Sequence, residues 1–562
     1  MATLNELLAR WATLGPPAED GAAQFSIVAG RETTADALQA LVEAAAPGHD
    51  PVVTPAFLGA LAEETGGRFW ILTFPDLDAQ RGETLAFEVA RALASELGLE
   101  SCRPVLVDSL IGQAMVDPTV AGAAGLVGFF TCKGDNMGPE ARGWAPWALG
   151  VKAAWDAHGK GAGVTIASID TGYSDHVELQ GVISAKPQLN LVENNANARD
   201  PFSTNVPFNN PGHGTLVASV AASRGDIDAE GNTTGPGEIT GAAPEAEILP
   251  IRAIRSVVDL RQSRIPAAIE HAIAQNCDVI VMALGSPFPI EPVEVALRAA
   301  VRQGIVVVCA AGNCVGLVVF PARFAPLGLS TAVAAVDYLK APWERTSKGD
   351  SVTVSAFGEA VWGARKRDQA SPNNAVARSE GTTLATSLTA GVAALWVARH
   401  GGRAALKAHA AAAGTTVQAM FNRLIAASAS KPSGGWPKGM GAGLVNAGEL
   451  LSRPLPETAA LLADVPLADD HVTPLKRFLG PTASEIDGLA GLEAAGLDEG
   501  LAAEALWRLY RGSARDRTAA IAGQDVIGAM GGVQLTRFNG PPPSPDLEAA
   551  LAGKPRLRDL AR

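Results

Sequence analysis

Apolar runs without a regular polar alternation recur through the middle of the chain. Helix-like amphipathic stretches separate them, and the runs are GVTIASID (163–170), AEILPIRAI (246–254), CDVIVMALG (277–285) and GIVVVCAAGN (304–313). Continuous Val- and Ile-rich strands between helices are typical of a parallel sheet buried on both faces. Because three of the runs end in Gly, Asp or Asn, we expect functional side chains at the carboxyl ends of these strands.

The two ends of the chain follow other patterns. The first part contains a strand pattern at RFWILTF (68–74), a helix pattern at 82–98 and a second strand pattern at 102–108, which together predict a small α+β domain. The segment 132–146, rich in Gly and Pro, is predicted to be a linker. After RPLP (453–456) the chain becomes rich in Ala, Leu and Glu, which favours a short helical region.

Length and composition agree with several domains. A chain of 562 residues exceeds the size at which one hydrophobic core stops growing, and 47% hydrophobic with 18% charged residues describes a folded, enzyme-sized protein. We therefore predict an α+β N-terminal domain over 1–140, an α/β domain over 141–455 and a helical C-terminal region over 456–562.

Charge and cysteine content narrow the classes of function. The 58 acidic and 45 basic residues give a net charge of −13, and no basic stripe suits phosphates, so nucleic acid is not an expected partner. No stretch reaches the roughly 18 apolar residues that span a bilayer, and the amino terminus lacks the apolar core of a secretory signal. Five cysteines without metal-ligand spacing favour reduced thiols. We expect a cytoplasmic protein without a membrane partner, with export by a leaderless route left open.

Four polar residues stand where these patterns change. Asp170 ends a strand before a Thr-Gly turn, His213 lies between two glycines before an apolar helix, Asn313 ends a strand in Ala-Gly-Asn, and Thr383 lies at a helix start. Each alone has a structural explanation as a turn former, a helix cap or a packed polar group. Together, a carboxylate, an imidazole, an amide and a hydroxyl in this chain order match the subtilisin-type catalytic triad with its oxyanion donor.

The surrounding sequence resembles the subtilase family of serine peptidases over about residues 145–452. The resemblance implies a three-layer, subtilisin-like fold with a mostly parallel central sheet. Seven segments carry it in order along the chain: 145–179, GHGTLVAS (212–219), GAAPEAEILPIRAI (241–254), VMALGSP (281–287), AAGN (310–313), FPARF (320–324) and GAGLVNAGELL (441–451).

The resemblance also implies a role for each candidate. Asp170 would orient His213, which would act as general base and then as general acid. The amide of Asn313 would donate a hydrogen bond to the oxyanion, and the attacking hydroxyl would be that of Thr383. An extended peptide substrate would pair as an added strand with the backbone of Ala283, Leu284 and Gly285.

Thr383 departs from the family pattern. Where the family has Gly-Thr-Ser-Met-Ala-Ser-Pro-His-Val-Ala-Gly, residues 381–391 are GTTLATSLTAG, so threonine replaces the nucleophilic serine. Its branched side chain is stiffer, and a displacement of about 1 Å would cost on the order of 10²-fold in rate. Two hypotheses follow: an endopeptidase that uses an Asp-His-Thr triad, or a catalytically impaired pseudopeptidase that binds peptides or serves as a scaffold.

Further expectations concern specificity, the end domains and cofactors. Val319 precedes FPARF where a subtilase with a deep first pocket has Gly, which predicts a preference for small side chains. The N-terminal domain occupies the position of a subtilase propeptide, with an unrelated accessory domain as the alternative. The end domains could bind a partner protein. No cofactor is expected; structural calcium is common in the family, but no EF-hand-like loop identifies ligands here.

Overall fold

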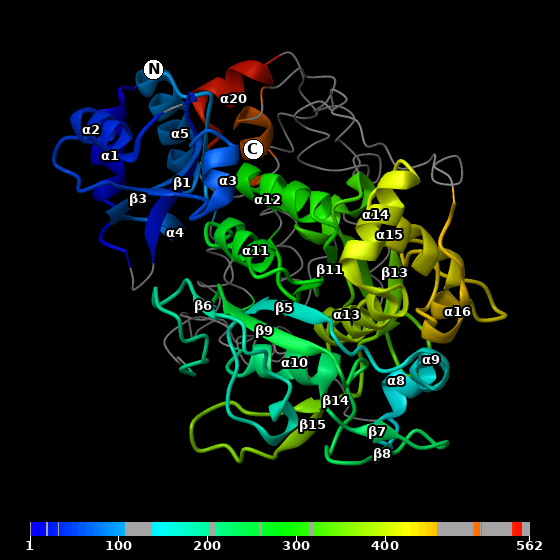
Figure 1. The fold of residues 1–562 in the computed structure, drawn as a ribbon. Helices are drawn as coiled ribbons and strands as arrows, with labels where there is room; N and C mark the ends of the chain where they lie inside the picture. The colour runs from blue at the N-terminus through cyan, green and yellow to red at the C-terminus, as the bar shows by residue number, and fades with distance from the viewer. Residues whose placement is uncertain are drawn as a thin grey trace.

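The computed structural model of the chain contains two larger β-sheets, each with its own helices, and two short hairpins (Figure 1). A four-stranded sheet lies in the N-terminal part and a seven-stranded sheet in the middle. The structure describes residues 2–17, 21–31, 33–106, 138–202, 210–255, 257, 261–286, 288–313, 318–457, 498, 500–505, 507–508 and 542–552.

The seven-stranded sheet is parallel throughout. Each neighbouring pair runs in the same direction, and every residue of β5, β10, β11 and β12 is buried, as the continuous apolar runs predict. In spatial order the strands are β13 (Val354–Phe357), β12 (Thr331–Val336), β11 (Val306–Ala310), β10 (Val279–Met282), β5 (Thr165–Asp170), β9 (Glu247–Arg252) and β6 (Leu189–Asn190).

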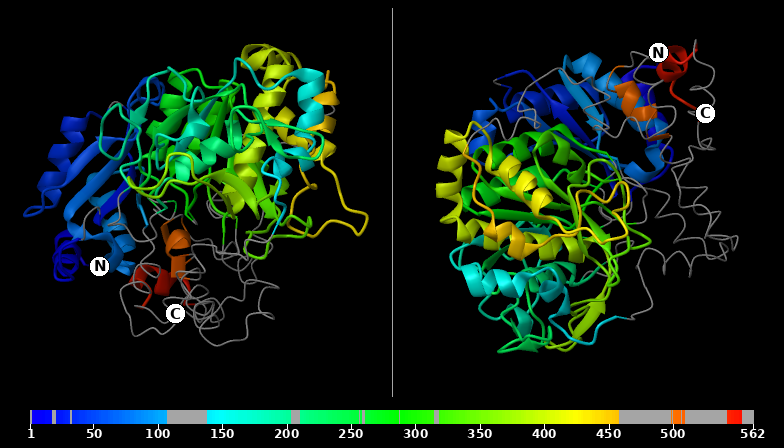
Figure 2. Two further views of the ribbon diagram at one scale, coloured as in Figure 1. Left: turned by 90° about the horizontal axis from the view of Figure 1, so that it is seen from below. Right: turned by 90° about the vertical axis from the view of Figure 1, so that its right-hand side faces the viewer.

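Helices cover both faces of this sheet (Figures 1 and 2). One face carries α10 (His213–Ala222) and α13 (Thr382–Arg399), and the other carries α11 (Ile265–Ala274) and α12 (Glu291–Arg302). Helix α13 is buried from Thr382 to Val397 and carries no charged side chain over this range, as expected of a helix inside a large core. The three-layer α/β arrangement confirms the predicted fold class.

The first described residues, 2–106, form the N-terminal unit. Its sheet is antiparallel, and its own core contains Trp11, Phe25 and Phe74. The strand predicted at 68–74 continues to Asp78, and the helix predicted at 82–98 is α5. The elements are α1 (Leu4–Ala12), β1 (Ala22–Val28), α2 (Ala35–Ala45), β2 (Val52–Pro55), α3 (Ala60–Glu64), β3 (Phe69–Asp78), α4 (Ala79–Gly82), α5 (Thr84–Leu97) and β4 (Ser101–Pro104).

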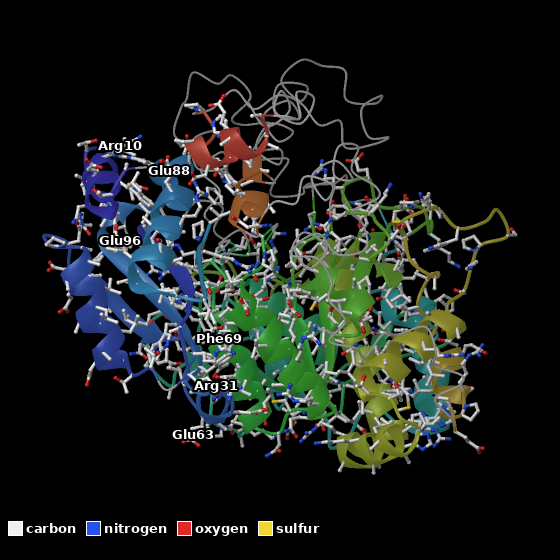
Figure 3. The ribbon with its side chains drawn as sticks, turned by 90° about the horizontal axis from the view of Figure 1, so that it is seen from above. Arg10, Arg31, Glu63, Phe69, Glu88 and Glu96 are labelled. Carbon is white, nitrogen blue, oxygen red and sulfur yellow. The ribbon has the colours of Figure 1, made fainter. Side chains whose placement is uncertain are left out.

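The N-terminal unit packs against α11 and α12. Phe69 lies where the two parts meet (Figure 3), and it stacks edge-on with Phe57 in the same apolar cluster as the residues of the central sheet. Glu270 of α11, which is 6% exposed, accepts hydrogen bonds from the backbone amides of Leu58, Gly59 and Leu61 at 2.5, 2.9 and 2.8 Å. A buried carboxylate therefore holds the start of α3.

The remaining described elements surround these two parts. Most of the helical region predicted for 456–562 lies outside the described residues, and the domain limits at 140 and 455 stay predictions. No helix in the described ranges combines the length and apolar character needed to cross a bilayer. The elements are α8 (Trp144–Ala148), α9 (Val151–His158), β7 (Asp226–Ile227), β8 (Thr233–Thr234), β14 (Val361–Ala364), β15 (Val376–Ser379), α14 (Gly402–Ala412), α15 (Val417–Ser428), α16 (Ala447–Ser452) and α20 (Pro545–Ala550), with 3₁₀ turns at Val177–Leu179 and Ala322–Leu327.

Candidate active site

Three of the predicted site residues meet at the carboxyl end of β5. His213 Nδ1 lies 2.8 and 3.0 Å from the two carboxylate oxygens of Asp170, and His213 Nε2 lies 3.1 Å from Thr383 Oγ1. The exposed fractions are 1% for Asp170, 9% for His213 and 7% for Thr383. The imidazole therefore bridges a buried carboxylate and a hydroxyl, each within hydrogen-bond distance.

The fold explains why these distant residues converge. Asp170 is the last residue of β5, His213 is the first residue of α10, and Thr383 lies in the first turn of α13. Since α10 and α13 pack against each other on one face of the sheet, their N-termini meet beside the end of β5. Gly212 before α10 has a φ of 76°, and a Cβ there would overlap the carbonyl oxygen of Lys366, so the position requires glycine.

A second buried carboxylate supports this arrangement. Asp200, which is 6% exposed, accepts hydrogen bonds from Thr171 Oγ1 at 3.1 Å and from the amide of Gly212 at 2.8 Å. Thr171 in turn donates its amide to Asp170 at 2.7 Å, and its hydroxyl accepts from the amide of Gly214 at 3.2 Å. Asp200 thus connects the turn after β5 with both neighbours of the imidazole.

Asn313 is oriented by Thr382. Its side-chain oxygen accepts the amide of Thr382 at 2.9 Å and the hydroxyl at 2.8 Å, which leaves the amide nitrogen Nδ2 for another partner. A Cβ on Gly381 would lie 3.1 Å from Nδ2 of Asn313, 3.7 Å from the backbone nitrogen of Thr383 and 3.8 Å from Thr383 Oγ1. Two donors and the hydroxyl therefore border the space that Gly381 leaves free. An oxyanion needs donors in this arrangement.

The predicted substrate-binding residues follow β10. Ala283 and Leu284 are 4% and 7% exposed, and Ser286 exchanges backbone hydrogen bonds of 2.9 and 2.8 Å with Phe320, next to Val319. The side chain of Val319, 6% exposed, fills the gap between two glycines. A Cβ on Gly312 would lie 3.1 Å from Val319 Cγ1, and one on Gly285 would overlap Val319 Cγ2. The valine therefore occupies space between the segment after β10 and the segment leading to Asn313.

The described thiols are poor nucleophile candidates. Cys102, Cys277 and Cys309 are unpaired, and burial raises the pKa of all three, that of Cys277 to about 12. A thiol with so high a pKa stays protonated at neutral pH. Within the described residues, no three His, Cys, Asp or Glu side chains gather as metal ligands.

Comparison with known proteins identifies the family. The pattern of the subtilase family (Peptidase S8) matches residues 161–443, half of the chain. The chain belongs to the subtilase family. It is 30% identical to subtilisin Savinase of Lederbergia lenta over 254 residues, which cover 44% of this chain and 83% of that protein. It is also 30% identical to thermitase of Thermoactinomyces vulgaris over 274 residues, or 48% of this chain and 87% of that protein.

Other relatives match over less of their length or at lower identity. M-protease of Shouchella clausii is 30% identical over 254 residues, which cover 44% of this subtilase and 59% of that protein, less than two thirds. A solved protease from Pseudoalteromonas arctica is 23% identical, with a TM-score of 0.45, and covers 54% of this subtilase and 93% of that chain.

This subtilase departs from the family motif beyond Thr383. Ser387 stands where the motif has proline, and its hydroxyl donates to the carbonyl of Thr383 at 2.8 Å. Thr386 makes the same contact with the carbonyl of Thr382 at 2.7 Å. The hydroxyl of Ser387 is therefore bonded within the helix, whereas the hydroxyl that meets His213 is that of Thr383.

Sequence reasoning missed three supporting residues of the site. Asp200 lies in ARDPF, which has the look of an ordinary turn and carries no signal of a buried carboxylate. Gly381 and Thr382 precede Thr383, and the sequence pattern was interpreted for Thr383 alone. The Gly-Thr-Thr order was the available signal, because a glycine before a helix start leaves room for a ligand atom.

Proposed function

We propose that this subtilase is an endopeptidase that hydrolyses peptide bonds in protein or peptide substrates, with Thr383 as nucleophile. The observation that carries the proposal is the 3.1 Å distance from Thr383 Oγ1 to His213 Nε2, with the opposite ring nitrogen held by Asp170. A base oriented by a carboxylate and within hydrogen-bond distance of a hydroxyl is the arrangement that nucleophilic catalysis requires.

The reaction would proceed in two stages. Thr383 Oγ1 attacks the carbonyl carbon while its proton passes to His213 Nε2, and the imidazolium is stabilised by Asp170. The negative oxygen of the tetrahedral intermediate would accept hydrogen bonds from Asn313 Nδ2 and from the amide of Thr383 beside Gly381. His213 then gives its proton to the leaving amine, which breaks the peptide bond and leaves an acyl ester on Thr383. Water, deprotonated by the same imidazole, hydrolyses the ester.

Substrate preference would follow from Val319. An extended peptide would pair with the backbone of Ala283, Leu284 and Gly285, and the side chain before the scissile bond would enter the space that Val319 narrows. We therefore propose cleavage after small residues such as Ala or Ser. Four expectations stay predictions: a cytoplasmic location, activity without a cofactor, structural calcium, and binding of a partner protein by the end domains.

Substitution of the nucleophile tests the proposal. Wild type, Thr383→Ser and Thr383→Ala are compared on casein and on an activated ester. We expect measurable hydrolysis in wild type, loss in the alanine variant, and a gain on the order of 10²-fold in the serine variant, where the methyl no longer restricts the oxygen. Thr389→Ala is the matched control, because Thr389 is a buried threonine of the same helix whose hydroxyl bonds the carbonyl of Ala385.

Two outcomes would contradict the proposal. An inactive wild type with an active serine variant would indicate a pseudopeptidase that binds peptides without cleaving them. Activity that persists in Thr383→Ala would exclude Thr383 as the nucleophile.

A further inference from the structure

The described C-terminal residues pack on the N-terminal unit. Residues 500–505 and 507–508 are helical, and together with 542–552, which contain α20, they lie beside α5 (Figures 1 and 2). We name these residues the clasp. We propose that the clasp keeps the N-terminal unit bound to the rest of the protein even when the chain between them is cut, so that this unit is a retained subunit and is not released.

An ion network from α5 holds both pieces of the clasp. Arg91 of α5 bonds Glu504 at 3.2 Å through Nη1 and Asp546 at 3.1 Å through Nε. Glu504 also accepts the amide and the hydroxyl of Ser544 at 2.7 and 2.6 Å. Because Glu504 is fully buried, removal of its cation would leave a carboxylate inside the protein, which is costly. One arginine therefore binds both halves of the clasp.

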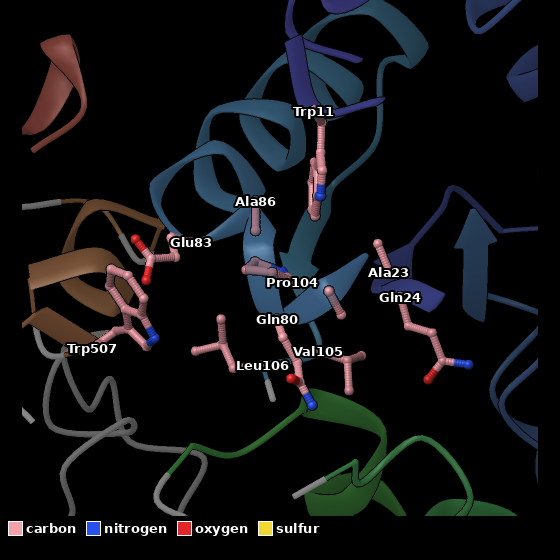
Figure 4. A pocket seen from close by; sticks show the side chains of 11 residues that line it. Trp11, Ala23, Gln24, Gln80, Glu83, Ala86, Pro104, Val105, Leu106 and Trp507 are labelled. Atoms are coloured by element: carbon pink, nitrogen blue, oxygen red, sulfur yellow. The ribbon is translucent and has the colours of Figure 1, made fainter. Parts of the chain in front are cut away.

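Apolar and polar contacts extend this interface. The ring of Trp507 lies 5.5 Å from that of Phe87, centroid to centroid, and Trp507 is 3% exposed. Thr84, one helical turn before Phe87, accepts a hydrogen bond from Arg508 at 3.3 Å and donates one to the carbonyl of Pro542 at 3.4 Å. Figure 4 shows Trp507 in the wall of a pocket shared with N-terminal residues, among them Glu83. Large buried aromatic contacts of this kind dominate the energy of interfaces.

The N-terminal unit is therefore gripped on two sides. Glu270 of α11 holds the start of α3 on one side, and the clasp holds α5 on the other. Both sets of contacts to the N-terminal unit are made by one chain. If one set is broken, the other keeps the unit close to the broken contacts, at a high effective concentration. If the proposed peptidase cut itself between 109 and 146, both grips would keep the N-terminal unit in place. The inference does not rest on catalysis by Thr383, because a different protease can make the cut.

The test uses the full chain with Thr383→Ala, which removes self-cleavage, and a recognition sequence for a site-specific protease inserted within residues 107–137. After complete cutting, gel filtration separates species by size, and a denaturing gel identifies the fragments. We expect the N-terminal fragment to elute with the remainder of the chain. We also expect its dissociation constant to rise by about 100-fold or more in Trp507→Ala and in Arg91→Ala.

Matched controls separate the clasp from general instability. Trp147→Ala changes a tryptophan of α8 that is 44% exposed, and Arg453→Ala removes an arginine paired at 2.9 Å with Glu449 on α16. Both should retain the N-terminal fragment as the parent does. If Arg91→Ala does not fold, Trp507→Ala provides the test, because loss of the Trp507 side chain leaves the core of the N-terminal unit intact. Immediate separation of the fragment in the parent protein, or a dissociation constant that is unchanged in Trp507→Ala, would overturn the inference.

Discussion

If the proposed peptidase function holds, removal of the Val319 side chain is expected to change which peptide bonds are cleaved. The valine lies between Gly285 and Gly312, where neither neighbour contributes a side chain, so Val319→Gly would leave a space bounded by backbone on two sides. A larger apolar side chain of the substrate, such as that of Leu or Phe, could fill this space. The substitution therefore tests whether the gap between these segments is the specificity pocket.

The expected magnitude follows from the carbon atoms exchanged. Valine has three side-chain carbons, and each buried carbon is worth about 0.8 kcal/mol, so a substrate side chain that replaces them gains about 2.4 kcal/mol. This corresponds to about a 60-fold rise in kcat/KM for Leu or Phe relative to Ala before the scissile bond. The unliganded protein loses the same contacts and gains a flexible glycine, which together cost about 3 kcal/mol of stability.

The assay compares peptide substrates that differ only in the residue before the scissile bond, with Ala, Leu and Phe at that position. Cleavage sites in casein, mapped by mass spectrometry, give an independent profile. Val352→Gly is the matched control, because Val352 is also 6% exposed and, like Val319, lies outside the helices and strands. It should lose comparable stability without a change of profile.

The assignment of the pocket would be refuted if the ratio of kcat/KM for the Phe substrate to kcat/KM for the Ala substrate were the same in Val319→Gly as in wild type. The same conclusion would follow if Val352→Gly altered the profile equally, since the effect would then come from destabilisation. A profile that moves toward large residues only in Val319→Gly supports it.

Three further changes test other parts of the structure. Asp170→Asn should lower kcat on the order of 10⁴-fold with little effect on KM, because the amide cannot stabilise the imidazolium. A change in KM as large as the change in kcat would contradict this role. Glu270→Gln should weaken binding of the cut N-terminal unit by about 2 kcal/mol, measured by titration, since three backbone amides lose a charged acceptor. Burial, with Glu504 and Asp546 nearby, raises the pKa of Glu88 despite Arg10 and Arg91, so the folded state binds more protons and wild-type stability falls as pH rises through that pKa. Glu88→Gln should therefore melt above wild type at pH 7 by differential scanning fluorimetry, and a difference that does not shrink in acid would contradict this.

The central sheet and the candidate site could be predicted because their signals are local. A strand buried on both faces has a continuous apolar run, as at 163–170, and the residue that ends it is marked by the change to polar sequence. Asp170 was found in this way. His213 directly follows Gly212 and Thr383 lies two residues after Gly381, each in the first turn of a helix, and the order of the candidates along the chain singled them out.

The contacts that join the parts of the molecule could not be predicted in this way. Arg91 and Glu504 are separated by 413 residues, and neither segment has a pattern that names the other. Glu270 has the sequence context of a polar position on an amphipathic helix, and its burial follows only from the docking of the N-terminal unit. Such residues become buried through tertiary contacts, which hydrophobic periodicity does not encode.

Support of a helix start and a catalytic role are compatible explanations for Asn313. The oxygen of Asn313 accepts both the amide and the hydroxyl of Thr382, so it satisfies a donor at the start of α13, where Gly381 offers no side chain. The nitrogen of the same amide borders the space beside Gly381. Because Asn313 supports the helix start as well as that space, selection for stability alone could retain it. The hydroxyl of Thr383 instead bonds His213, and substitution of that hydroxyl therefore separates chemistry from folding.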